Sequence, residues 1–108
     1  MASVNWAHYT IVDPLNPGQS RVLTFRETET NPFTWFGKAL SVSILPDRLP
    51  SIDLPPGGAF FRAIEVTGVV YRTEGTSEIL QTLVDITYQN RGSDPIPYYD
   101  VFLGLISE

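Results

Sequence analysis

Proline and glycine divide this chain into short pieces, and that punctuation limits the secondary structure it can form. Nine Pro and eight Gly are spread over 108 residues, and the longest segment free of both runs from Thr76 to Arg91. Pro cannot continue a helix and Gly weakens one, so helices have little room. The sequence therefore favours short strands.

Within these pieces apolar and polar residues alternate, which is the period of a strand with one buried face. In the first segment Ala7, Tyr9 and Ile11 point one way. Trp6, His8 and Thr10 point the other way. The same pattern predicts three further inward faces: Leu23 and Phe25; Phe36, Leu40, Val42 and Ile44; Tyr99, Val101, Leu103 and Leu105.

A long hairpin is predicted near residues 60–73 and 78–90. Its first strand changes phase at Gly68, because Val69, Val70 and Tyr71 do not continue the alternation that precedes them, and this predicts a β-bulge. Residues 77–90 also satisfy helical spacing, with Ser77 as a cap. The β-favouring Thr82, Thr87 and Tyr88 favour the strand.

Six or seven short strands predict an all-β fold: one antiparallel β-sandwich domain over residues 1–108, immunoglobulin-like or jelly-roll-like. The segment from Val84 to Ser93, followed by Pro95-Ile96-Pro97, resembles the strand-turn-strand unit of immunoglobulin-like surface domains. The resemblance supports the fold class and no particular family. Residues 45–58 carry four Pro and are expected to form a semi-rigid crossover.

Composition excludes several function classes. The chain has no Cys, a single His (His8) and a single Lys (Lys38), so disulfides, sulfur-based metal sites and sites that need two imidazoles are excluded. A net charge of −5 without a basic stripe argues against nucleic acid as a partner. No apolar run approaches the roughly 20 residues that span a bilayer. Residues 1–6 do not resemble a signal peptide, so cytoplasmic synthesis is the default, with later assembly into a surface or particle structure left open.

Known catalytic motifs are not found, and we expect no enzyme, no cofactor and no metal site. His8 is interpreted as a surface residue. The carboxylates that share a segment, Asp47 with Asp53 and Asp94 with Asp100, leave a carboxylate-based glycoside hydrolase as a weak alternative. Asp94, Asp100 and Asn90 could also supply oxygen ligands to calcium, but the dense acidic spacing of calcium loops is missing.

Aromatic residues make up 12% of the chain, and one wet-faced sheet cannot bury all of them. Two sets of candidates follow. The candidate ligand-binding residues are Trp35, Asn90, Asp94, Tyr98 and Asp100, and the candidate interface residues are Trp6 and Phe61.

The leading hypothesis is a non-catalytic structural or assembly module that binds protein, itself or a partner, through sheet edges and exposed aromatics. The alternative is a small carbohydrate-binding domain with a glycan ligand, in which Trp35 or Tyr98 stacks on sugar and Asn90, Asp94 or Asp100 binds hydroxyls.

Overall fold

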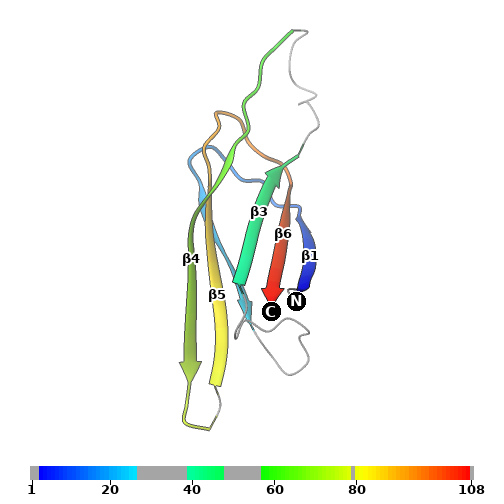
Figure 1. The fold of residues 1–108 in the computed structure, drawn as a ribbon. Helices are drawn as coiled ribbons and strands as arrows, with labels where there is room; N and C mark the ends of the chain where they lie inside the picture. The colour runs from blue at the N-terminus through cyan, green and yellow to red at the C-terminus, as the bar shows by residue number, and fades with distance from the viewer. Residues whose placement is uncertain (1–2, 27–38, 48–56, 79, 108) are drawn as a thin grey trace.

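The computed structural model describes residues 3–26, 39–47, 57–78 and 80–107. Six strands are found there: β1 (Ser3–Ile11), β2 (Ser20–Arg26), β3 (Ala39–Pro46), β4 (Ile64–Gly75), β5 (Leu80–Asn90) and β6 (Tyr99–Ser107) (Figure 1). In this part of the chain there is no helix of the length and apolar character needed to cross a membrane. The predicted all-β class is confirmed.

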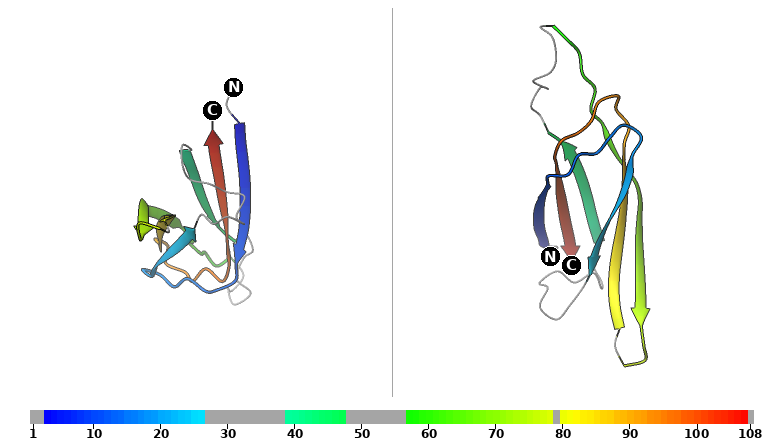
Figure 2. Two further views of the ribbon diagram at one scale, coloured as in Figure 1. Left: turned by 90° about the horizontal axis from the view of Figure 1, so that it is seen from below. Right: turned by 180° about the vertical axis from the view of Figure 1, so that it is seen from behind.

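The strands form two antiparallel three-stranded sheets, ordered β1-β6-β3 and β2-β5-β4, which pack face to face as a sandwich (Figure 2). The central strands β6 and β5 supply most of the core, because both of their neighbours in the sheet shield them from water. The core cluster comprises Leu15, Ile44, Val84, Ile86, Tyr88, Ile96, Tyr99, Val101 and Leu103. The predicted sandwich is thus confirmed.

The two halves of the chain pair with each other as a long antiparallel ribbon, and this ribbon is rolled into the two sheets. β1 pairs with β6 and β2 pairs with β5. Between these pairs the two connecting loops cross from one sheet to the other side by side, joined by an isolated antiparallel bridge between Leu15 and Ile96. Both crossing loops therefore join the two sheets of the sandwich side by side.

Alternation predicted the inner face of β1 at Ala7 and Ile11, whereas Tyr9 of the same predicted face is 41% exposed. Phe36, which was also predicted to face inward, lies outside the described residues. Ala7 and Ile11 pack against the core while His8 and Thr10 are exposed. Residues 80–90 form a strand rather than a helix, and Val84, Ile86 and Tyr88 are all buried on its inner face.

The predicted hairpin is present as β4 and β5, and the predicted bulge is confirmed. Val66 pairs with Tyr88 and Gly68 with Thr87, so Thr67 is the extra residue. β4 begins at Ile64 rather than near residue 60. Residues 61–63 instead hydrogen-bond to the loop after β5, with Arg91 N donating to Ala63 O at 2.7 Å. β4 also runs through Gly75, so the turn comes later than expected.

Candidate functional site

One exposed surface of the sandwich gathers aromatic and polar side chains: the outer face of the β1-β6-β3 sheet. Because side chains alternate along a strand, the outward residues of β1 lie beside the outward residues of β6. The register pairs Trp6 with Gly104, His8 with Phe102 and Thr10 with Asp100. We call these six residues the aromatic face.

Trp6 lies over the backbone of β6 at Gly104. A Cβ atom placed on Gly104 would lie 2.7 Å from Trp6 Cζ3, 2.9 Å from Cη2 and 3.1 Å from Cε3. Three such similar distances to consecutive ring atoms place Gly104 beneath the ring face rather than at its edge. Trp6 is nevertheless 65% exposed, so the opposite side of the indole faces solvent.

His8 stacks on Phe102 beside this indole. The ring centroids are 4.5 Å apart and the planes are inclined by 13°. His8 Nε2 donates to Asp100 Oδ1 at 2.9 Å, and Thr10 Oγ1 donates to the same oxygen at 2.7 Å. These contacts fix the orientation of the imidazole ring on both its face and its edge.

The arrangement does not suit nucleophilic catalysis. A serine- or threonine-type nucleophile needs a base that removes its proton, with a carboxylate behind that base. Here the Thr10 hydroxyl proton points to Asp100 rather than to His8. The same groups do suit recognition, because they display flat rings beside fixed hydrogen-bonding groups.

β3 completes this face on its other side. Ser41 pairs with Gly104 and Ser43 pairs with Phe102, and both serines are exposed. Next along the strand Leu45 is also exposed. Hydroxyl groups therefore lie beside the rings of Trp6 and Phe102, with no further charge from the described part of β3.

The predicted ligand residues Asn90 and Asp94 lie together, but at the corner where the ribbon crosses between sheets. Asn90 is buried. Its Nδ2 donates to Leu15 O and to Asp94 O, each at 2.9 Å, and its Oδ1 accepts from Gly92 N at 2.8 Å. This side chain therefore joins both crossing loops.

The Asp94 carboxylate is engaged at the same corner. Its Oδ2 accepts from Phe61 N at 2.6 Å and from Ser93 Oγ at 3.2 Å. The Phe61 side chain itself is 58% exposed. Tyr98 is half-buried, and its carbonyl accepts from Asp47 N at 3.3 Å. Trp35 lies outside the described residues.

The remaining predicted carboxylates do not form a described acidic pair. Asp47 is buried and forms an ion pair with Arg62 at 3.0 Å, and Arg62 stacks over Phe60. Asp53 lies outside the described residues. Within the described ranges no three His, Asp or Glu side chains come together as metal ligands would.

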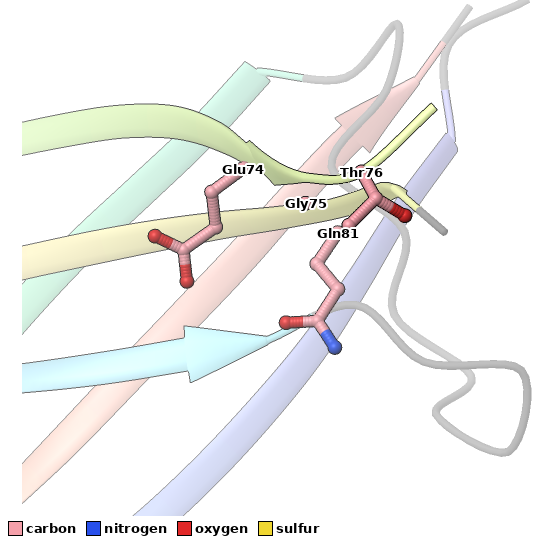
Figure 3. Close-up of a pocket in the computed structure, with 4 residues that line it drawn as sticks. All are labelled: Glu74, Gly75, Thr76 and Gln81. Atoms are coloured by element: carbon pink, nitrogen blue, oxygen red, sulfur yellow. The ribbon is translucent and has the colours of Figure 1, made fainter. Parts of the chain in front are cut away.

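A shallow hollow at the tip of the β4-β5 hairpin is lined by Glu74, Gly75, Thr76 and Gln81 (Figure 3). Glu74 and Gln81 are cross-strand partners, and their side chains project to the same side of the hairpin (Figure 3). A single carboxylate beside an amide offers only hydrogen bonding, so this hollow carries little chemistry.

Sequence reasoning singled out Trp6 and Asp100 separately and missed what joins them. Gly104 and Phe102 were not recognised as parts of a site. The available signal was a glycine in the middle of an apolar strand, which is unfavourable unless something packs against its backbone. Comparison with protein-family models, with curated proteins and with solved structures gives no match.

Proposed function

We propose that this chain is a non-catalytic assembly subunit that associates with a second copy of itself through the edge of β4 that pairs with no strand in the described residues. The observation that carries the proposal is the exposure of residues 69–75, which we call the β4 arm. Val69, Val70 and Tyr71 there are 39%, 56% and 50% exposed.

These three residues expose apolar surface on both faces of an edge strand. Val69 and Tyr71 pair with the buried Ile86 and Val84 and so face inward, whereas Val70 faces outward. The hairpin extends past the other strands at this end of the molecule (Figure 1). An edge strand with unpaired backbone groups and apolar side chains is a template for strand addition.

The arm is also suited to a like-charged partner. Arg72 binds Asp85 at 2.7 Å and Glu74 at 2.5 Å, so its charge is largely balanced within the chain. Within the arm the charges of Arg72 and Glu74 therefore cancel, although each whole chain carries a net charge of −5. The bulge at Thr67 disrupts the pairing of β4 before the arm begins. The arm is therefore the regularly paired part of this edge strand.

Sedimentation equilibrium tests the proposal with a matched pair of variants. Val70 and Val22 are outward-facing valines, 56% and 57% exposed, on the two edge strands of the same sheet. We expect a concentration-dependent dimer for the wild type and for Val22→Lys, and a monomer for Val70→Lys. A wild-type monomer up to about 1 mM, a concentration at which weak dimers form, would reject the proposal.

A further inference from the structure

Trp6 on the aromatic face is 65% exposed, and one side of its ring lies against β6 at Gly104. Gly104 lies in the central strand β6, where a glycine costs about 0.5 to 1 kcal/mol relative to Ala. Any larger residue would displace the indole. Gly104 therefore weakens the sheet but leaves room for the ring of Trp6. The other side of that ring faces solvent.

We infer that the aromatic face binds a neutral saccharide, with one pyranose ring stacked on the solvent-exposed side of Trp6. A pyranose has a face of C–H groups, which are weakly positive and apolar. Such a face complements the negative face of an aromatic ring. The stacked area is also removed from water on both partners.

Hydrogen-bonding groups lie near Trp6 on the same face of the sheet. Ser41 lies next to Gly104 on the β3 side, and Ser43 lies next to Phe102. On the β1 side the imidazole of His8 stands half-exposed, already oriented by Phe102 and Asp100. A flat apolar surface with a few fixed polar groups is typical of ligand sites.

The charge of this face selects an uncharged ligand. Its described outward residues carry one carboxylate, Asp100, which is hydrogen-bonded to the imidazole of His8. No Lys or Arg lies among them, and the whole chain is acidic. An anionic sugar would therefore meet repulsion without a compensating cation. This inference is independent of the proposed dimer, because β4 belongs to the other sheet.

The test follows the indole N–H signals of the chain's two Trp residues by NMR during titration with cellohexaose, chitohexaose and maltohexaose. Trp35→Phe assigns the two signals. We expect a saturable shift of the Trp6 signal with at least one of these sugars, and no shift with an oligogalacturonate. No Trp6 shift with any neutral sugar, a shift of Trp35 alone, or tighter binding of the oligogalacturonate would overturn the inference.

Two variants separate stacking from a purely structural role. Trp6→Ala removes the ring, and Gly104→Ala keeps the ring but tilts it, because the added methyl collides with the indole side chain and not with backbone. We expect each to weaken sugar binding at least about tenfold while the amide spectrum stays dispersed. Unchanged sugar affinity in folded Gly104→Ala would overturn the inference. A Trp6→Ala variant that loses dimerisation but still binds the sugar would also overturn it.

Discussion

Two regions of the molecule contain similar residues in opposite environments. One is the corner, where the loops after β1 and after β5 cross between the sheets and are joined by the bridge between Leu15 and Ile96; the other is the β4 arm. At the corner Tyr88 is 1% exposed and Tyr99 is fully buried, whereas Tyr71 in the arm is 50% exposed. At the corner two loops and both sheets enclose the side chains, and every polar group must find a partner. The arm lies on an edge strand, and among the described strands it has a neighbour on one side only. Residue type does not distinguish the two regions; the layers around them do.

The corner depends first on a close backbone crossing at Gly92. A Cβ atom there would collide with Phe61 O and would lie 2.9 Å from Ala63 N. We expect Gly92→Ala to lower the free energy of unfolding by about 3 kcal/mol or more, measured by urea denaturation. Gly104→Ala is the control, since it meets only a movable ring. Equal losses in the two variants would contradict this account.

Asn90 is expected to have the next largest effect. Asn90→Ala leaves Asp94 O and Gly92 N without this partner, while Leu15 O keeps its hydrogen bond from Ile96 N. Unsatisfied buried groups each cost about 1 to 3 kcal/mol. We expect a loss of about 3 kcal/mol in total. Gln89→Ala, which removes one exposed hydrogen bond to Gly18 O, should cost far less. A small loss for Asn90→Ala would show that the crossing loops hold together without this side chain.

The two buried tyrosines test whether the corner acts as a network. Their hydroxyls are hydrogen-bonded to each other, and Tyr99 also accepts from Arg21 at 3.3 Å. We expect Tyr99→Phe to cost about 1 to 2 kcal/mol and Tyr88→Phe less, because Tyr99 keeps Arg21. The double variant should cost less than the sum. Strict additivity in a double-mutant cycle would contradict the coupling.

Alkaline pH should weaken the corner through the same pair. Burial, followed by the hydrogen bond with Tyr99, raises the pKa of Tyr88 above its ordinary value of 10.0. The protonated phenol is therefore favoured by folding, so its contribution is complete below pH 10 and is lost as pH rises toward the folded pKa. Tyr88→Phe should flatten the decline in stability above about pH 10. An unchanged slope of stability against pH in Tyr88→Phe would contradict this prediction.

The smallest effect is expected from Asp85, which pairs with Val70 of the arm in the β2-β5-β4 sheet. The hydrogen bond from Arg72, then that from Thr24, lowers the pKa of Asp85 below its ordinary value of 3.8. The contribution of Asp85 is therefore present above that value and is lost as pH falls toward the folded pKa. Asp85→Asn should slightly lower the melting temperature at neutral pH, and its difference from the wild type should shrink as pH falls below 3.8. A loss as large as that of Asn90→Ala would remove the contrast between the two regions.

Much of the architecture could be predicted from local patterns. Alternation assigned the inward face of β1, and the broken alternation around Gly68 located the bulge. These features depend on neighbours along the chain. The contacts of Asn90 could not be predicted this way, because Leu15 lies far away in sequence and reaches Asn90 only through the crossing of two loops. The partnership of Trp6 with Gly104 likewise depends on the register of β1 with β6.

By itself the sequence determined that the chain forms strands rather than helices, because proline and glycine leave little room for a helix and the period of two assigns residues to opposite faces. Only the tertiary structure decided which of those faces and edges are covered. Burial depends on which strands become neighbours, and the rolling of the ribbon places β6 and β5 at the centre. That same rolling leaves Trp6 and the β4 arm exposed to solvent.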